Sequence, residues 1–135
     1  MPMLYVIQFG GNFTEKTPSE EIIYIVCSLH DLVQLNQEFY FSDGHPVNNL
    51  TTFYDKSKLE DILDIIDWVA IDKPYWGGEE NLEPKRKKQA EFLIKGDIPF
   101  YVIKKFICYN DKAKDNLVRL GVKSSMIQIN ENAYF

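Results

Sequence analysis

A chain of 135 residues, 45% of them apolar and 26% charged, predicts one domain that buries a core at roughly two thirds of its unfolded surface. Its formal net charge of −5 excludes a general nucleic-acid coat, because an acidic surface repels phosphate. Any binding of nucleic acid must therefore be local.

The first third of the chain predicts two strands, a helix and a further strand. Residues 3–9 form a continuous run of aromatic, aliphatic and β-branched side chains, which predicts a strand covered on both faces. Residues 22–27 have the same character and predict a second buried strand. Ser28 is suited to cap a short helix over residues 29–35, whose apolar positions fall at helical spacing. The weak alternation of residues 38–41 predicts a short strand that ends at a turn.

The middle of the chain predicts helices followed by loops. Residues 47–54 and, more strongly, residues 58–66 carry apolar side chains at helical spacing. An aromatic-rich region follows and ends at the two glycines of residues 77–78. The polar residues 79–84 then predict a loop that leads into a run of four cations, which are Lys85, Arg86, Lys87 and Lys88.

The last third of the chain predicts three strands and one helix. The strands fall at residues 89–94, 106–109 and 126–129. Residues 112–120 predict a helix that Asn110 or Asp111 can cap, and Gly121 is placed to end it. The whole pattern, about six strands mixed with four or five helices, predicts an α+β fold because strands and helices do not alternate strictly.

Glu91 is the strongest candidate for a catalytic residue. The two-residue period of a strand puts it on the face opposite Phe92 and Ile94, in a cleft or in water. A carboxylate there can hold a sugar hydroxyl, take a proton or stabilise a developing positive charge. On spacing alone, however, an exposed strand residue after a basic turn explains the pattern better.

The basic run and the aromatic region are candidates for binding nucleic acid. Residues 85–88 can steer DNA or cradle a pyrophosphate, although charge runs are usually solvated loops. Tyr75 and Trp76 are the better candidates for an exposed surface that stacks an unpaired base, which is worth about 1–3 kcal/mol per base. Trp68 lies beside a helical apolar face and is better explained as part of the core.

Neither cysteine predicts a disulfide or a metal site. Cys27 and Cys108 lie in apolar, strand-like runs, which are typical of reduced and buried thiols. Neither has a second cysteine or a histidine at zinc-ligand spacing, so we expect no metal. No run approaches the ~20 apolar residues of a membrane span, and the N-terminus lacks a signal-peptide pattern. We therefore expect a cytoplasmic protein without a membrane partner.

Several stretches resemble one known family in the same order along the chain. The run KRKKQAEFLIKGDIPF is similar to the segment around the catalytic glutamate of the DarT family, DNA ADP-ribosyltransferase toxins that use NAD to modify a base in single-stranded DNA. The other similar stretches are MPMLYVI, IIYIVCSLHDLVQLNQEFYFSDGHPVNNLTTFYD, the tryptophan segment of residues 67–76 and the closing IQINENAYF. The resemblance implies a single DarT-like domain over residues 1–135, with a split and strongly bent β-sheet core surrounded by helices.

The resemblance also implies roles for individual residues. Glu91 would bond the 2′-hydroxyl of the nicotinamide ribose in NAD, the co-substrate, and favour the departure of nicotinamide. His45 matches a family motif near the cleft and would bind the DNA strand or aid proton transfer, although an exposed turn histidine is an equal alternative. The family favours arginines where this chain has three lysines, so Arg86 is the first candidate for a phosphate contact.

The partners implied are single-stranded DNA, modified at thymidine or guanosine, and a macrodomain-type antitoxin. The resemblance starts in the middle of the family pattern, whose N-terminal part brings much of the NAD pocket, so we also expect a second chain that completes the fold. The alternative is a truncated, non-catalytic module that binds single-stranded nucleic acid or a protein through the basic run and the aromatic residues.

Overall fold

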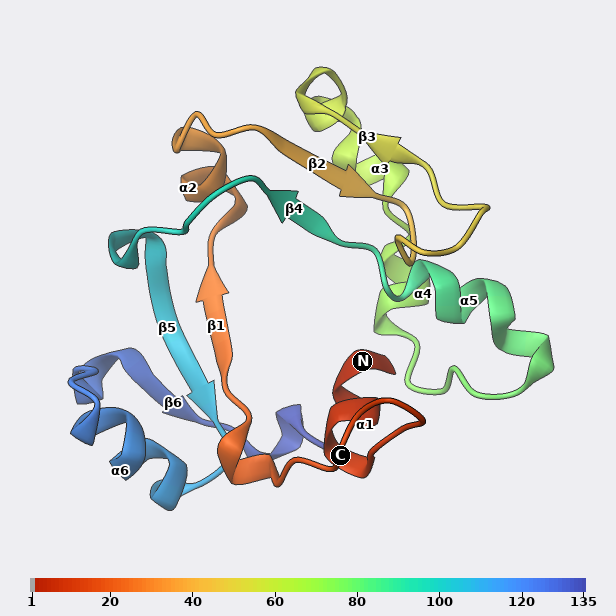
Figure 1. The fold of residues 1–135 in the computed structure, drawn as a ribbon. Helices are drawn as coiled ribbons and strands as arrows, with labels where there is room; N and C mark the ends of the chain where they lie inside the picture. Colours follow the sequence, from red (N-terminus) through yellow and green to blue (C-terminus); the bar gives the residue numbers. More distant parts are fainter. Residues whose placement is uncertain (1) are drawn as a thin grey trace. The chain divides into compact units, whose positions relative to one another are not determined.

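The computed structural model describes residues 2–135 (Figure 1). The chain forms two compact units. Unit 1 contains Gln37–Gly96 together with the first residues of the chain, and unit 2 contains Leu4–Asn36 and Asp97–Phe135. Every candidate site residue named above lies in unit 1.

Unit 1 is built on a three-stranded antiparallel sheet. Its central strand, β2 (Phe39–Ser42), pairs with β3 (Phe53–Tyr54) on one side and with β4 (Phe92–Ile94) on the other (Figure 1). Phe39 and Phe41 point to the same face, as the two-residue period requires, and both are buried. Phe39 stacks on Phe92 and Phe41 stacks on Tyr54, with ring centroids 4.9 and 5.3 Å apart. Aromatic pairs across the strands therefore fix the register of this sheet.

The remaining elements of unit 1 are short helical segments. One of them is the helix of residues 68–72, which Asp67 caps by accepting a hydrogen bond from the backbone N–H of Ala70. The last helix runs almost directly into β4 (Figure 1). In chain order the segments are the 3-10 helix η2 (Lys56–Asp61), α3 (Ile62–Ile65), α4 (Trp68–Asp72), the 3-10 helix η3 (Glu79–Asn81) and α5 (Leu82–Lys87).

Unit 2 contains a second three-stranded sheet. Strand β5 (Ile103–Cys108) lies in the centre, antiparallel to β1 (Tyr24–Cys27) and parallel to β6 (Ile127–Ile129). The core of unit 2 lies between this sheet and α6 (Asp111–Arg119), the helix that connects the parallel strands β5 and β6. The other segments of the unit are α2 (Leu29–Gln34) and the 3-10 helices η1 (Ser19–Glu21), η4 (Phe100–Val102), η5 (Ser124–Met126) and η6 (Glu131–Ala133).

Two predicted helix caps in unit 2 are confirmed. The Ser28 hydroxyl accepts a hydrogen bond from the backbone N–H of Asp31, and the Asn110 side chain accepts one from that of Ala113. Gly121 has a φ of 91° and ends α6, because glycine adopts this left-handed conformation without a steric cost.

The buried Cys108 and the half-buried Cys27 are both free thiols. Within residues 2–135, no helix is long and apolar enough to cross a membrane.

Residues 3–9 were predicted as a strand, and this prediction is wrong. They belong to the helix α1 (Pro2–Phe9). A short apolar run has no period that separates a buried strand from a buried helix. Leu4 and Gln8, four residues apart on one helical face, are both buried. The Gln8 amide donates to the Ser19 hydroxyl at 2.7 Å and accepts from the backbone N–H of Phe135, which fastens this helix inside unit 2.

The helix predicted over residues 47–54 is wrong as well, whereas the helical prediction over residues 58–66 is confirmed. The first stretch forms turns and then β3, and the second forms a 3-10 helix followed by one turn of α-helix. In the first stretch, side chains bond the backbone locally and compete with helix formation. Asn48 accepts from the N–H of Leu50, and the Thr51 hydroxyl donates to the carbonyl of His45.

The loop and basic turn predicted over residues 79–88 are also wrong. The segment folds as η3 and α5, so the four cations lie on and just after a helix. Helix geometry separates consecutive side chains by about 100°. The run therefore cannot present one continuous charged edge.

Alkaline pH should destabilise unit 2 through Tyr134. Its hydroxyl donates to the carbonyls of Ile22 and Ile107, and burial raises its pKa to about 12. The unfolded side chain ionises near pH ~10, so this contribution is complete below that pH and is lost as the pH rises through about 12. We expect urea unfolding, followed by circular dichroism, to show this loss. The loss should be smaller in Tyr134→Phe, and an equal loss in both proteins would contradict the assignment.

Candidate active site

The main chain of Glu91 is fixed by Ser42, at the point where β2 ends and β4 begins. The Ser42 N–H donates to the Glu91 carbonyl at 2.9 Å, and the Glu91 N–H donates to the Ser42 hydroxyl oxygen at 3.1 Å. The Glu91 side chain is half-buried. Across the part of the chain that the structure describes, no hydrogen bond or ion pair holds its carboxylate. The carboxylate is thus positioned by the backbone beneath it and free to accept a bond from a ligand.

His45 lies in a turn that is tied to the end of α5. Its N–H donates to the carbonyl of Arg86 at 2.9 Å, five residues before Glu91. Its ring nitrogen Nδ1 accepts from the N–H of Val47 at 3.2 Å, which leaves Nε2 as the nitrogen that carries the proton in the neutral ring. The structure therefore brings the main chains of His45, Arg86 and Glu91 into one connected segment of unit 1.

Arg86 lies in the interior of unit 1, with a side chain 7% exposed. Its Nη1 donates to Asp43 at 3.0 Å and to Thr51 at 3.2 Å, while Nε and Nη2 both bond Glu83. These hydrogen bonds raise the pKa of Arg86, that with Glu83 most, and lower the pKa of Glu83. A guanidinium engaged in this way joins α5 to the His45 turn. This geometry favours a structural role for Arg86 over the predicted contact with phosphate.

Gly44 makes room for the Arg86 side chain. It is buried, and a methyl group in place of its hydrogen would overlap the Arg86 guanidinium. The Ser42 hydroxyl donates to the Gly44 carbonyl at 2.7 Å, so the turn is bonded to Ser42 as well as to Arg86. From the sequence, Ser42 and Gly44 were assigned only to the turn that follows the predicted strand of residues 38–41. Neither was given a role at the site, and the signal that points to one is their place between an aromatic strand and a histidine.

Two lysines of the basic run also have partners inside unit 1. The ammonium of Lys87 contacts the Asp67 carboxylate at 2.9 Å. The ammonium of Lys88 bonds the carbonyls of Ile71 and Lys73, at and just beyond the end of α4. A cation at the C-terminal end of a helix satisfies its free carbonyls and the negative end of its dipole. These two side chains hold α4 against the end of α5.

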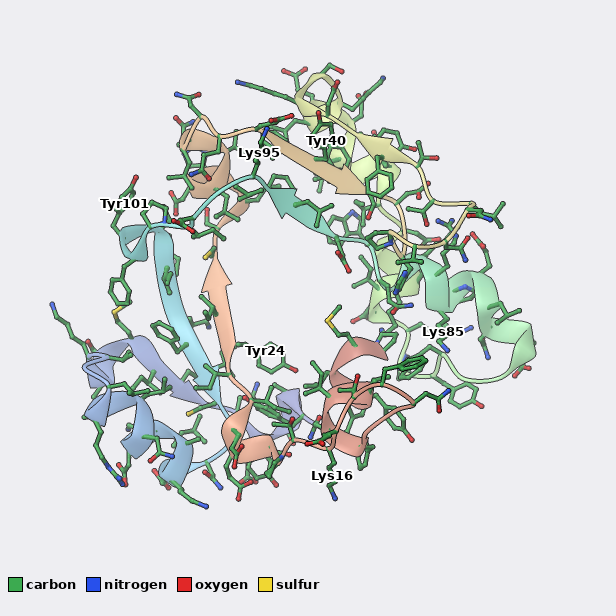
Figure 2. All side chains as sticks on the ribbon, viewed as in Figure 1. Lys16, Tyr24, Tyr40, Lys85, Lys95 and Tyr101 are labelled. Atoms are coloured by element: carbon green, nitrogen blue, oxygen red, sulfur yellow. The ribbon has the colours of Figure 1, made fainter. Side chains whose placement is uncertain are left out.

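Lys85 differs from the rest of the basic run because it is exposed. Figure 2 shows it on α5. Its ammonium lies 5.8 Å from the centroid of the Trp76 ring, which is within range of a cation–π interaction. Tyr75, the residue before Trp76 in the sequence, is 63% exposed. Trp76 itself is half-buried, although it was predicted to be exposed. The fold brings Lys85 to Trp76, and these two residues with Tyr75 are named here the aromatic–lysine surface.

Other aromatic and charged groups of unit 1 lie elsewhere. Trp68 is 50% exposed, with its indole N–H bonded to the carbonyl of Leu63, so its assignment to the core is wrong. Tyr40 and Lys95 both bond the Glu38 carboxylate on the outer face of the sheet (Figure 2). No group of three potential metal ligands was found among residues 2–135.

The family described as "ssDNA thymidine ADP-ribosyltransferase, DarT" matches residues 1–135. A DNA ADP-ribosyl transferase of Thermus sp. (strain 2.9) is 29% identical over 119 residues, which are 88% of this chain and 54% of the relative. One of Thermus aquaticus is 32% identical over 106 residues, or 76% of this chain and 42% of the relative. The chain thus spans about half the length of these relatives.

Solved structures give the same result for the fold. Thermus sp. 2.9 DarT in complex with NAD⁺ has a TM-score of 0.84 and 26% identity, covering 99% of this chain and 67% of that one. The same protein in complex with ADP-ribosylated single-stranded DNA has a TM-score of 0.83 and 26% identity, covering 99% and 64%. The predicted α+β fold of the ADP-ribosyltransferase kind is confirmed.

Proposed function

This chain belongs to the DarT family, and we propose that it acts in the transfer of ADP-ribose from NAD to a base of single-stranded DNA, with Glu91 as its catalytic residue. One observation carries the proposal. The Glu91 carboxylate is half-buried, fixed through its backbone and without an internal partner across residues 2–135. A glutamate needed only for the fold would be expected to use its charge within the protein, as Glu83 does with Arg86.

The proposed reaction needs one carboxylate. Glu91 accepts a hydrogen bond from the 2′-hydroxyl of the nicotinamide ribose, and its negative charge stabilises the positive charge that develops on that ribose. The bond between the ribose C1 and nicotinamide breaks, and nicotinamide leaves with the electron pair. A nitrogen of the base then bonds to the same carbon and releases its proton, for which the carboxylate is an acceptor.

His45 is proposed to act at the same site. Its turn is tied to the residue that ends α5, and its Nε2–H is the ring's remaining donor. That donor can bond a phosphate or a base of the DNA strand. A role in binding needs only this donor, whereas a role in proton transfer needs the ring to change its charge.

The aromatic–lysine surface is the proposed contact for the strand beyond the modified base. Base stacking on exposed aromatic rings tolerates any sequence, and a neighbouring ammonium supplies the charge for a phosphate. Of the four cations in the basic run, we assign this contact to Lys85. Arg86, Lys87 and Lys88 contribute to DNA binding only indirectly, because their side chains hold α4 and α5 in place within unit 1.

Removing the charge of Lys85 should weaken DNA binding and its dependence on salt. Each phosphate contact with a single strand contributes a slope of about −0.7 to the plot of log affinity against log salt. We expect Lys85→Ala to reduce that slope by about this amount, measured by fluorescence anisotropy of a labelled oligonucleotide. Lys112→Ala, which removes an exposed lysine on α6, is the matched control. Equal slopes for Lys85→Ala and the wild-type protein would remove this lysine from the interface.

The family description favours thymidine over guanosine as the target. Incubating the chain with NAD and oligonucleotides, followed by mass spectrometry, tests both the reaction and the base. We expect an adduct on single-stranded DNA that contains thymidine, and none on the matched duplex or on a strand without thymidine. The absence of any adduct would refute catalysis by this chain, and an adduct confined to guanosine would refute the choice of base.

Toxicity, a macrodomain-type antitoxin and a cytoplasmic location remain further parts of the proposal. Modification of a base stops its pairing in replication, so expression should arrest growth if the transfer occurs in cells. Glu91→Gln should abolish that arrest, and co-expression of an ADP-ribose-removing macrodomain protein should relieve it. Arrest that persists in Glu91→Gln would separate toxicity from the transfer.

A further inference from the structure

Ser42 occupies an unusual position in the sheet of unit 1. It ends β2 and is completely buried. The register of β2 with β4 pairs Phe41 with Phe92, so the next opposed pair is Ser42 and Glu91. In an antiparallel ladder such a pair exchanges two bonds between main-chain N–H and carbonyl groups. The bond from the Ser42 N–H to the Glu91 carbonyl has this form.

The second bond of the pair has a different acceptor. The Glu91 N–H donates to the Ser42 hydroxyl oxygen rather than to its carbonyl. The side chain therefore replaces a main-chain group at the place where the two strands separate. The hydroxyl proton in turn bonds the Gly44 carbonyl, at the start of the turn that carries His45. One hydroxyl group thus links the peptide of Glu91 to that turn.

We propose that Ser42 is a positioning residue, whose hydroxyl sets the orientation of the Glu91 peptide relative to the His45 turn. The proposal rests on the proposed function of Glu91. An alanine at this position has no acceptor for the Glu91 N–H and no donor for the Gly44 carbonyl. The N–H would then turn toward the Ser42 carbonyl or toward water, and either movement rotates the carboxylate. Reaction rates fall steeply when a catalytic group is displaced, even where the ligands still bind.

Amide hydrogen exchange tests the positioning without any need for turnover. In Ser42→Ala the Glu91 amide should exchange at least about 10-fold faster, because a buried donor has lost its acceptor. The amides of Tyr40 and Leu93, farther along the same pair of strands, should keep their rates. Ser28→Ala removes a similar bond, between a serine hydroxyl and a backbone N–H, in unit 2 and is the matched control. An unchanged Glu91 amide in Ser42→Ala would overturn the proposal.

Steady-state kinetics test the consequence for catalysis. We expect Ser42→Ala to lower kcat by about 10-fold or more while KM for NAD and for the oligonucleotide changes less than about twofold. Ser42→Thr, which retains the hydroxyl, should recover most of kcat. Equal kcat in Ser42→Ala and Ser28→Ala would also overturn the proposal. A wild-type chain without activity would instead refute the proposed function, and the exchange experiment would still decide what Ser42 does.

Discussion

Glu91→Gln should slow the transfer of ADP-ribose by about 10²–10⁴-fold. Glutamine has nearly the shape of glutamate and retains the backbone bonds to Ser42, so the fold should be preserved. It has no negative charge to stabilise the cationic transition state, and it is a poor acceptor for a proton. Single-turnover rates with NAD and a thymidine-containing oligonucleotide measure the loss. Dissociation constants for both ligands should change much less than the rate.

The matched control for Glu91→Gln is Glu60→Gln. Glu60 is an exposed glutamate on η2, so the substitution removes the same charge from unit 1 without touching the site. It should leave the rate within about twofold of the wild-type protein, since surface substitutions of this kind have small effects. A Glu91→Gln protein that reacts as fast as this control would exclude Glu91 from the chemistry.

Arg86→Ala should destabilise unit 1 by about 2–4 kcal/mol. Removing one partner of a buried ion pair costs about 3–5 kcal/mol, and the partial exposure of the Glu83 and Asp43 side chains lowers that figure here. Trp68 and Trp76 are the two tryptophans of the chain and both lie in unit 1. Tryptophan fluorescence during urea unfolding therefore measures the free energy of unfolding of this unit.

The second arginine of the chain provides the control for this prediction. Arg119 is exposed at the end of α6, in unit 2, and Arg119→Ala should change the stability of unit 1 by less than about 0.5 kcal/mol. Gly44→Ala should destabilise unit 1 as well, because the added methyl group displaces the Arg86 guanidinium. Equal unfolding curves for the two arginine variants would show that Arg86 does not hold the turn. If Arg86→Ala instead lost DNA binding while its free energy of unfolding stayed unchanged, Arg86 would belong to the DNA interface.

The sequence predicted some elements well because their signals are local. The caps at Ser28 and Asn110 need only one side chain and the backbone three residues later. All strands of the two sheets except β3 were also predicted, because they carry aromatic or β-branched residues between turn signals, whereas β3 lies in a stretch predicted as a helix. Residues 3–9 failed because their apolar run fits a strand and a helix equally well, and only the packing of Leu4 and Gln8 decides between them.

The site could be predicted only in part. The two-residue period was applied to a strand predicted over residues 89–94, but β4 begins at Phe92 and Glu91 lies directly before it. The period gives no chemistry in any case, and the resemblance to a family supplied the role. The four cations of the basic run were treated as one group that could steer DNA or cradle a pyrophosphate. Their environments differ, because α5 turns Arg86 toward Asp43 and Glu83 and leaves Lys85 exposed. No local pattern reports such long-range partners, which depend on the fold of the whole unit.

The role proposed for Ser42 could not be predicted from the sequence either. Serine at the end of a strand is common and carries no signal by itself. Its importance arises from Glu91, which lies 49 positions later in the chain and becomes its neighbour only when β2 and β4 pair. Residues that position a catalytic group across a sheet are therefore found from register and hydrogen bonds, after the strands are known.

The position of the nicotinamide ribose tests the central claim most directly. A crystal structure of this protein with carba-NAD⁺, the analogue bound in one of the Thermus sp. structures, would give the distance between the Glu91 carboxylate and the ribose 2′-hydroxyl. The account predicts a hydrogen bond of about 2.6–3.0 Å between them. A ribose bound elsewhere, with its 2′-hydroxyl bonded to other residues and Glu91 still facing solvent, would contradict it.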